Sequence, residues 1–236
     1  MQAIILAAGM GTRFGKMTES IPKGMIPVTG KPMIIQSIDK LQKAGVEKII
    51  IGTGYHREIY DGLASRYHNV ETCFSPKYAS TNSMYTLYNS RESLNDDFLL
   101  LESDIIYNQQ ALDVLIDSKY KNAMLVTPVR KFQDQYYVEY DRNDVLTNCS
   151  TNKNALHYGG EMVGIHKLSR SFFRKMCEDY ASQIQTSPKL GYEFELLRIS
   201  RMMMPLHVVM DNDVHWYEID DEKDLIFAKK HVAKYC

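Results

Sequence analysis

Cysteines are few and scattered in this sequence. Four occur in 236 residues, at positions 73, 149, 177 and 236, with no C-x-x-C pair and no histidine at zinc-ligand spacing. A disulfide framework or a structural zinc site needs cysteines in pairs at short, regular intervals. We therefore expect four reduced thiols and a cytoplasmic protein.

Long apolar runs and an excess of charge of one sign are also missing. Apolar runs such as 49–51 and 98–101 are much shorter than the roughly 20 residues that a membrane-spanning helix needs. The formal net charge is −1, and no block of like charge stands out. These absences argue against a membrane span and leave a nucleic-acid or membrane-surface partner without support.

The sequence does have the composition of a globular protein, 44% hydrophobic and 24% charged. Strand patterns alternate with helical patterns in its first half, which predicts an α/β fold with a mostly parallel, mixed sheet flanked by helices. The predicted strands cover 2–6, 46–51, 70–74, 98–101 and 124–126, and the predicted helices cover 31–44, 56–67, 80–94 and a segment that includes 112–116.

After residue 130 the pattern changes. The stretches "QYYVEYD" (135–141) and "VLTNCS" (145–150) predict two antiparallel strands joined by a turn. No linker or repeat divides the chain, so we expect one domain, residues 1–236, with an antiparallel lid-like insertion at roughly 130–200. A fusion to, or a partnership with, other enzymes of a pathway stays open. The later predicted strands cover 161–165, 207–210 and 216–219, and the later helices cover 169–182, 192–202 and 221–234.

A glycine-rich turn follows the first predicted strand. It reads "AAGMGTRFG" (7–15) and contains three glycines and Arg13. Glycines let backbone N–H groups converge on an anion, and an arginine can pair with phosphate oxygens. The turn is neither a G-x-x-x-x-G-K-[ST] loop nor a G-x-G-x-x-G loop, so by itself it leaves a tight turn with a surface arginine equally open.

A longer stretch favours phosphate binding. The segment "AAGMGTRFGKMTESIPKGMIPVTGKPMI" (7–34) resembles the signature of the sugar-nucleotidyltransferase superfamily, in which a glycine loop ending in Arg is followed by Pro-Lys and then by Gly-Lys-Pro. The resemblance implies a Rossmann-like enzyme in which a phosphate monoester attacks the α-phosphate of a nucleoside triphosphate and releases pyrophosphate. It implies catalytic roles for Arg13 at the triphosphate and Lys23 at the α-phosphate, whereas the plain alternative for Lys23 is a solvated loop lysine. The other nucleotide-binding residues expected on or next to this stretch are Leu6, Ala7, Ala8, Gly9, Gly11 and Thr12.

Two aspartates that follow predicted strands are candidate magnesium ligands. A triphosphate brings Mg²⁺, which prefers carboxylate and water oxygens, and doubly wound sheets bind ligands beyond the carboxyl ends of their strands. Asp104 follows strand 98–101, and Asp220 ends "WYEID". The superfamily resemblance implies that both bind the metal, although Asp220 could instead cap a helix. Glu102 is expected beside the nucleotide as a partner of these ligands.

Two further stretches indicate the nucleotide and the acceptor. "SPKYASTNSMYTLYNSRESL" (75–94) and "WYEIDDEKDL" (216–225) look like stretches of bacterial cytidylyltransferases that act on choline phosphate. This resemblance implies CTP and a small zwitterionic phosphate or phosphonate acceptor, with Asn82 and Ser83 near the nucleotide. For Leu87 and Tyr88 a place in the core of a helix is the simpler interpretation.

The head group of the acceptor distinguishes two substrates. Aromatic side chains bind the quaternary ammonium of choline, whereas a primary ammonium needs carboxylates or carbonyls. The stretches "GGEMVGI" (159–165) and "GYEFELL" (191–197) are rich in acid, and "LLLESD" and "GEMVGI" are similar to stretches of 2-aminoethylphosphonate cytidylyltransferases. We therefore prefer 2-aminoethylphosphonate to phosphocholine. The expected acceptor-binding residues are Glu161, Met162, Tyr192, Glu193 and Glu195, with Arg130 and Lys153 at the phosphoryl group, although surface exposure is the alternative for Glu193, Glu195, Arg130 and Lys153.

Two other functions stay open. A hexose-1-phosphate nucleotidyltransferase would want a sugar pocket and usually a longer chain, and the sequence indicates neither. A nucleotide-sensing domain without catalysis would predict loss of the charged residues at the glycine loop and strand ends. All four of these, Arg13, Lys23, Asp104 and Asp220, are present.

Overall fold

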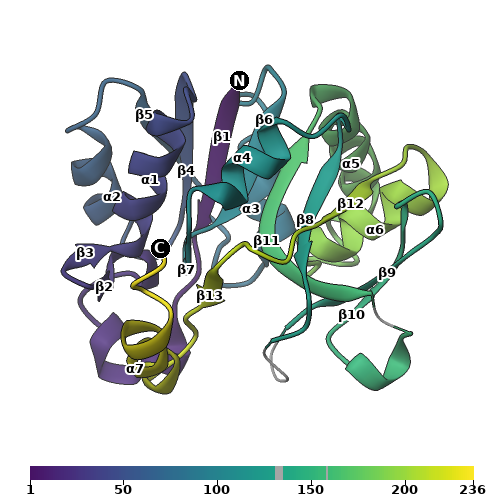
Figure 1. Cartoon of the computed structure of the whole chain (residues 1–236). Helices are drawn as coiled ribbons and strands as arrows, with labels where there is room; N and C mark the ends of the chain where they lie inside the picture. Colours follow the sequence, from purple (N-terminus) through teal and green to yellow (C-terminus); the bar gives the residue numbers. More distant parts are fainter. Residues whose placement is uncertain (131–134, 158) are drawn as a thin grey trace.

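A mixed β-sheet forms the centre of the molecule (Figure 1). The computed structural model describes residues 1–130, 135–157 and 159–236. In the first part of the sheet, β1 (Gln2–Ala7) lies between β4 (Lys48–Thr53) and β6 (Phe98–Glu102), and β5 (Val70–Phe74) pairs with β4. All these pairs are parallel, so the carboxyl ends of the four strands meet at one edge of the sheet.

The second part of the sheet is built around the long strand β11 (Gly160–Leu168). This strand pairs antiparallel with β6 and with β8 (Ala123–Thr127), and β12 (His207–Met210) lies parallel to β8. The hairpin of β9 (Tyr137–Tyr140) and β10 (Leu146–Ser150) joins the start of β11. The expected antiparallel hairpin is thus confirmed, whereas β11, within the region expected to be a lid-like insertion, is a strand of the main sheet.

Helices cover both faces of the sheet. Side chains of α1, α2 and α4 pack with residues such as Ile5 of β1, and side chains of α3, α5 and α6 pack with residues such as Ile4. Alternate residues of a strand point to opposite faces, so a strand that is apolar along its whole length contributes to two cores. The helices are α1 (Met33–Lys43), α2 (Arg57–Ala64), α3 (Ser83–Asn89), α4 (Gln110–Ile116), α5 (Arg170–Gln183) and α6 (Tyr192–Met202).

Short elements surround the carboxyl ends of β1 and β6. A third apolar cluster, which includes Phe14, Ile106, Ile219 and Leu225, holds the C-terminal segment beside the loop that follows β1. These short elements are the 3-10 turns η1 (Thr12–Thr18) and η2 (Lys23–Met25), the paired strands β2 (Pro27–Val28) and β3 (Lys31–Pro32), the paired strands β7 (Ile105–Tyr107) and β13 (Trp216–Glu218), and α7 (Glu222–His231). A further 3-10 turn, η3 (Lys153–Ala155), lies between β10 and β11 in the chain.

The predicted α/β fold is confirmed, and the differences lie at the ends of elements. Helix α1 begins at Met33 because the two residues before it pair with β2. Helix α3 begins after Asn82, whose side chain accepts a hydrogen bond from the Ser83 N–H group and caps the helix. The sequence does not predict β7, because three apolar residues are too few to show a period.

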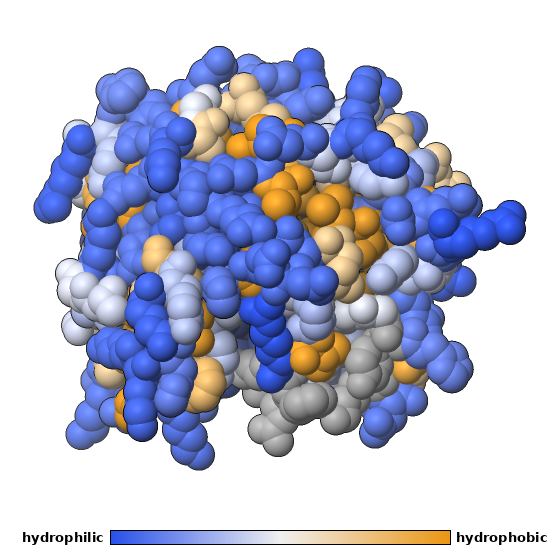
Figure 2. Space-filling model, viewed as in Figure 1, coloured by the Kyte–Doolittle hydropathy of each residue, from blue (hydrophilic) through white to orange (hydrophobic). Residues whose placement is uncertain are grey.

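Polar side chains cover most of the face shown in Figure 2, with a small group of apolar residues near its centre. The most exposed large apolar side chains, Met202 and Ile226, belong to α6 and α7. Among the helices that the structure describes, none is long and apolar enough to cross a bilayer.

Candidate active site

A cavity of about 450 Å³ opens at the carboxyl ends of β1 and β6. The connections reverse direction at β1, which has β4 on one side and β6 on the other, and doubly wound sheets bind ligands at such a point. Most of the residues that the sequence predicts for nucleotide, metal and acceptor meet here. They are Leu6, Ala7, Ala8, Gly9, Gly11, Thr12, Arg13, Lys23, Asn82, Ser83, Glu102, Asp104, Met162, Tyr192, Glu193 and Asp220.

The glycine loop after β1 borders this cavity. Gly11 has a φ of +61°, and a Cβ atom there would lie 3.1 Å from Thr18 Cγ2 and 3.2 Å from Lys23 Cβ. Glycine is the residue that combines a left-handed backbone with so close an approach. The Thr18 hydroxyl donates a hydrogen bond to the Gly11 carbonyl over 2.9 Å. The loop therefore packs directly against the downstream lysine.

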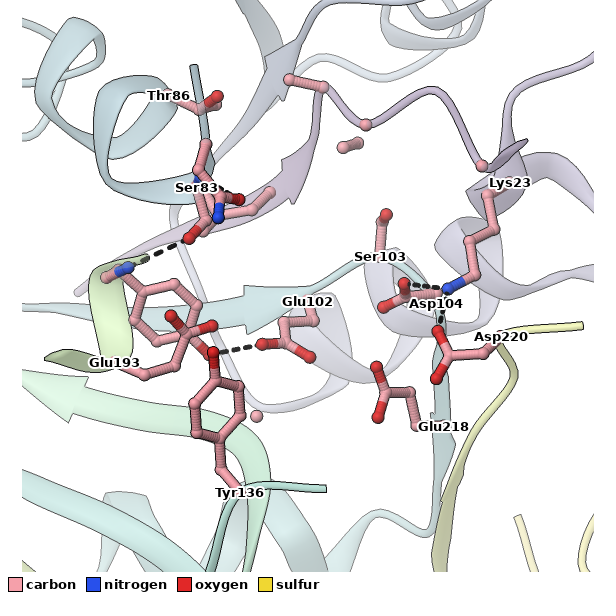
Figure 3. A pocket seen from close by; sticks show the side chains of 18 of the residues that line it. Lys23, Ser83, Thr86, Glu102, Ser103, Asp104, Tyr136, Glu193, Glu218 and Asp220 are labelled. Atoms are coloured by element: carbon pink, nitrogen blue, oxygen red, sulfur yellow. Dashed lines mark hydrogen bonds and ion pairs between the residues drawn. The ribbon is translucent and has the colours of Figure 1, made fainter. Parts of the chain in front are cut away.

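Lys23 lies between two aspartates in the cavity (Figure 3). Its Nζ atom is 2.5 Å from Asp104 Oδ2 and 2.6 Å from Asp220 Oδ1, and Arg13 Nη2 is 2.6 Å from the same Asp220 oxygen. The Lys23 side chain is only 12% exposed, so it is not a solvated loop lysine. Arg13, by contrast, is half-exposed. The predicted cations and acids thus form one network.

Three carboxylates near Lys23 converge in the way that the ligands of a metal cation do. Oxygens of Glu102, Asp104 and Glu218 lie within 4.8 Å of one another. Hard divalent cations such as Mg²⁺ prefer carboxylate oxygens, so this donor set fits one. Asp104 belongs to the set, whereas Asp220 lies on the side of Lys23 and Arg13. Glu102, expected beside the nucleotide, lies among these acids and also lines the cavity.

The pKa values in this cluster follow from burial and from the concentration of acids. Burial alone would lower the pKa of Lys23, but the charges of Asp104, Asp220 and Glu218 outweigh it and raise that pKa. Burial raises the pKa of Glu218 to about 8, and the neighbouring aspartates add to the shift. The pKa of Glu102 is raised for the same two reasons. A site with this excess of negative charge attracts cations.

The two aspartates meet because β7 pairs with β13. In this pairing Ile105 lies opposite Glu218, and the Ile219 N–H group donates a hydrogen bond to the Asp104 carbonyl over 2.9 Å. Asp221, not Asp220, caps α7 by accepting a hydrogen bond from the Asp224 N–H group. The helix-cap alternative for Asp220 is therefore wrong, and its carboxylate faces the cavity.

Glu193 lies at the other end of the cavity from Lys23 (Figure 3). It is 7% exposed, and its Oε2 atom has no hydrogen-bond partner among the described residues. Burial raises the pKa of this carboxyl to about 7. Tyr136 and Met162 line the cavity with it. A buried carboxyl group that lines a cavity and has an oxygen without a partner is suited to accept a hydrogen bond from a ligand.

Asn82 and Ser83 bind the segment that leads into α6. Asn82 Nδ2 donates to the Lys189 carbonyl over 3.3 Å, and Ser83 Oγ accepts from the Tyr192 N–H group over 3.0 Å. The first turn of α3 is thereby tied to the start of α6, which carries Glu193. Both residues line the cavity as predicted, and both also have this structural role.

Arg130 and Glu161 lie outside the cavity, next to a neighbouring one of about 500 Å³. Adjacent residues of a strand point to opposite faces, so Met162 enters the first cavity and Glu161 turns away from it. Glu161 Oε2 accepts from the Arg130 N–H group over 2.7 Å, and the Arg130 guanidinium donates to the carbonyls of Asn212 and Val214. This geometry gives no support to acceptor-binding roles for Arg130 and Glu161.

Glu195 does not reach the cavity either. Two residues apart on a helix point to nearly opposite sides, so Glu193 and Glu195 cannot share a pocket. Glu195 is fully buried, and Gln183 Nε2 lies 3.5 Å from its Oε2 atom. Burial raises the pKa of Glu195 to about 8, with a further contribution from Asp179. The expected contact of Lys153 with the acceptor concerns a side chain outside the described residues.

Glu195→Gln should make the protein more stable at pH 8 by roughly 4 kcal/mol and change stability little near pH 4.5. The folded protein holds a proton on Glu195 up to about pH 8, whereas the unfolded chain loses it near pH 4.5. The wild-type protein therefore loses stability as pH rises between these values. Urea unfolding at several pH values measures the effect, with the exposed Glu92→Gln as control; parallel pH profiles for Glu195→Gln and wild type would contradict it.

Glu218 and Tyr136 are among the cavity-lining residues that the sequence analysis does not predict. Glu218 stands two residues before Asp220 at the end of a strand, and strand residues two apart share a face. That period is the signal by which Glu218 could have been found. Tyr136 directly precedes β9 and carries no such signal.

Comparisons with known proteins identify the family of this chain. Residues 2–146, more than half of the chain, match the family model described as Nucleotidyl transferase. The chain belongs to the nucleotidyl transferase family. Over 153 residues this nucleotidyl transferase is 32% identical to a choline-phosphate cytidylyltransferase of Streptococcus pneumoniae, an alignment that covers 65% of this chain and 66% of that protein.

Another relative and one solved structure extend the comparison of this nucleotidyl transferase. It is 25% identical to the CMP-5'-(3-aminopropyl)phosphonate synthase of Streptomyces rubellomurinus over 95% of this chain and 37% of that protein. The chain thus spans less than two thirds of the length of both curated relatives. The fold is shared with the CTP:phosphocholine cytidylyltransferase structure from Streptococcus pneumoniae, with a TM-score of 0.80, 24% identity and 97% of each chain covered.

Proposed function

We propose that this nucleotidyl transferase transfers CMP from CTP to a small phosphonate or phosphate that carries an amine, with 2-aminoethylphosphonate preferred to phosphocholine. One observation carries the proposal: a single cavity has a lysine between two aspartates at one end and a buried carboxylate oxygen without a partner at the other. The first end suits a triphosphate and the second an ammonium group.

Two relatives support the nucleotide and the class of acceptor. The name of the Streptococcus relative refers to a cytidylyl group and to choline phosphate. The name of the Streptomyces relative refers to CMP and to an aminopropylphosphonate. Both partner compounds combine a phosphorus oxyanion with a nitrogen a few bonds away. The cavity offers Lys23 and Arg13 to the oxyanion of such a molecule and the Glu193 carboxyl group to its nitrogen.

The reaction needs no covalent intermediate with the enzyme. An anionic oxygen of the acceptor forms a bond to the α-phosphorus of CTP while the bond from that phosphorus to the bridging oxygen breaks, and pyrophosphate leaves with the electron pair. Lys23 neutralises charge at the α-phosphate, and Arg13 binds oxygens of the triphosphate. The glycine loop supplies backbone N–H groups to the same phosphates. The chain's contribution is therefore positioning and neutralisation of charge.

The acidic residues define where a metal ion belongs in this scheme. Asp104 and the neighbouring carboxylates of Glu102 and Glu218 are the residues that would hold Mg²⁺, with Asp220 beside them. Mg²⁺ supplies further neutralisation of charge on the phosphates when it is bound.

Pyrophosphate release tests the proposed function. The protein is incubated with Mg²⁺ and each nucleoside triphosphate, paired in turn with 2-aminoethylphosphonate, phosphocholine and a hexose 1-phosphate. We expect the fastest release from CTP with 2-aminoethylphosphonate. Release with no pair would overturn the enzymatic function, and faster turnover of phosphocholine would overturn the preferred acceptor.

Phosphocholine is the second candidate because of one observation at the Glu193 end. Tyr136 and Tyr192 both line the cavity there, and an aromatic ring can hold a quaternary ammonium. The buried acid favours the primary ammonium, since only an N–H donor satisfies its free oxygen.

Glu193→Gln should raise the KM for 2-aminoethylphosphonate by about ten- to a hundredfold, because a charged hydrogen bond to the ammonium is lost. The KM for CTP should change little. Initial rates at varied concentrations of each substrate measure both constants. The exposed Glu92→Gln is the matched control and should leave both constants as in the wild type. Equal rises of both KM values in Glu193→Gln would place Glu193 away from the amine.

A further inference from the structure

A buried hydrogen-bond chain leads from the interior of the sheet to the acidic cluster. His166, in the middle of β11, lies with Nε2 3.3 Å from the Tyr192 hydroxyl, and that hydroxyl donates to Glu102 Oε1 over 2.6 Å. His166 and Tyr192 are both fully buried. We propose that His166 and Tyr192 are positioning residues that fix the Glu102 carboxylate for a divalent cation. This proposal rests on the proposed function, in which these acids hold Mg²⁺.

The direction of donation follows from the number of protons available. Burial lowers the pKa of His166 to about 3, so the ring is neutral at physiological pH and has one N–H group. The tyrosine has one proton, and the short bond to a carboxylate is the stronger place for it. Nε2–H of His166 then donates to the tyrosine oxygen. The opposite arrangement would leave the carboxylate oxygen without its donor.

The second ring nitrogen of His166 indicates that the bond to Tyr192 is the reason for a histidine at this position. His166 Nδ1 has no hydrogen-bond partner among the described residues. A buried ring nitrogen without a partner lowers the stability of the folded protein. An apolar side chain between Leu100 and Met124 would avoid this cost. The bond to Tyr192 is the contact that distinguishes His166 from an apolar residue.

The other side of Glu102 is limited by Gly164. This glycine has a φ of +80°, and a Cβ atom there would lie 2.8 Å from Glu102 Oε2. One carboxylate oxygen is therefore held by Tyr192, while the other passes over the bare backbone of β11. Because the Tyr192 hydroxyl holds one oxygen and the Gly164 backbone limits the other, the Glu102 carboxylate keeps one orientation toward Asp104 and Glu218. Metal affinity depends on such outer contacts as well as on the ligands themselves.

Titration with Mn²⁺, followed by the EPR signal of the free ion, tests the proposal without turnover. Tyr192→Phe keeps the ring but removes the hydroxyl, and we expect it to weaken Mn²⁺ binding by about ten- to a hundredfold. The Mg²⁺ concentration for half-maximal pyrophosphate release should rise in parallel, while the KM for the acceptor stays near the wild-type value. A change in the KM for the acceptor alone would make Tyr192 a substrate contact and overturn the proposal.

His166 is tested by three variants. His166→Leu should weaken Mn²⁺ binding by about three- to tenfold, since it removes one neutral hydrogen bond, and His166→Gln, which retains an N–H donor, should restore most of the affinity. In the Tyr192→Phe background, His166→Leu should have no further effect, because His166 acts through the hydroxyl. The proposal would be overturned if the losses of Mn²⁺ affinity from His166→Leu and Tyr192→Phe were additive, or if neither of these single variants changed the affinity.

Folding and function are separated by two controls. Thermal unfolding of each variant shows whether it is folded, and if His166→Leu fails to fold, Tyr192→Phe and His166→Gln still decide the question. Wild-type protein that binds Mn²⁺ but releases no pyrophosphate would contradict the proposed function alone. Wild-type activity with unchanged Mn²⁺ affinity in Tyr192→Phe would contradict this positioning role alone.

Discussion

Lys23→Ala is expected to lower kcat by about a thousandfold, as measured by pyrophosphate release from CTP and the preferred acceptor. Enzymes that transfer phosphoryl groups lose about this much when a cation at the reacting phosphorus is removed. Lys23 is the buried cation of the cavity, with Nζ within 2.6 Å of both Asp104 and Asp220. Arg13 is half-exposed and pairs with Asp220, so it does not replace the buried cation between the two aspartates.

The same substitution is expected to lower the melting temperature in the absence of Mg²⁺. The charges of Asp104, Asp220 and Glu218 act on Lys23, and removal of this cation leaves the three acids to repel one another. Added Mg²⁺ should recover part of the loss, because a bound cation stabilises the folded state.

Lys16→Ala is the matched control for both effects. Lys16 lies in η1, on the same loop, but is exposed and does not line the cavity. It should leave kcat and the melting temperature unchanged. A near-normal kcat in Lys23→Ala would remove this lysine from the α-phosphate, whereas equal losses in both variants would indicate a general effect of charge on the loop.

Asp104→Asn is expected to lower kcat/KM by about a hundredfold or more and to raise the Mg²⁺ concentration needed for activity. A metal ion that polarises phosphate oxygens contributes several kcal/mol, and each 1.4 kcal/mol is about a factor of ten. Asp104 belongs to the group of three converging carboxylates and also pairs with Lys23. The amide keeps the size of the side chain but removes the negative charge that interacts with Lys23 and with the metal ion.

Asp213→Asn provides the comparison for this variant. Asp213 is an exposed carboxylate shortly before β13, outside the cavity. Rates measured over a range of Mg²⁺ concentrations should coincide for Asp213→Asn and the wild type. If Asp104→Asn keeps the Mg²⁺ dependence of the wild type, Asp104 is not a metal ligand, whatever its effect on the maximal rate.

Local sequence was enough for the first part of the site. The glycine loop, Lys23 and Asp104 follow strands β1 and β6, and apolar runs identify both strands. Parallel neighbours bring their carboxyl ends together, so the loop and Asp104 had to lie at the same edge once the strands were adjacent. The resemblance of residues 7–34 to a known signature then gave these side chains their expected roles.

The acceptor end was harder to predict because side-chain direction depends on local period and register. Met162 enters the cavity while Glu161 turns away, as neighbours on a strand must. Glu193 enters while Glu195 is buried between helices, as residues two apart on a helix must. A sequence shows such residues as neighbours, and only their placement in an element tells which of them share a pocket.

By itself the sequence determined the α/β fold, the glycine loop and the charged residues at the strand ends, because these depend on short-range patterns. Only the tertiary structure decided how the acids meet. The pairing of β7 with β13 places Glu218 and Asp220 beside Asp104, and the pairing of β11 with β6 sets His166 and Gly164 behind Glu102. These contacts join segments far apart in the chain, and their register depends on packing across the whole sheet.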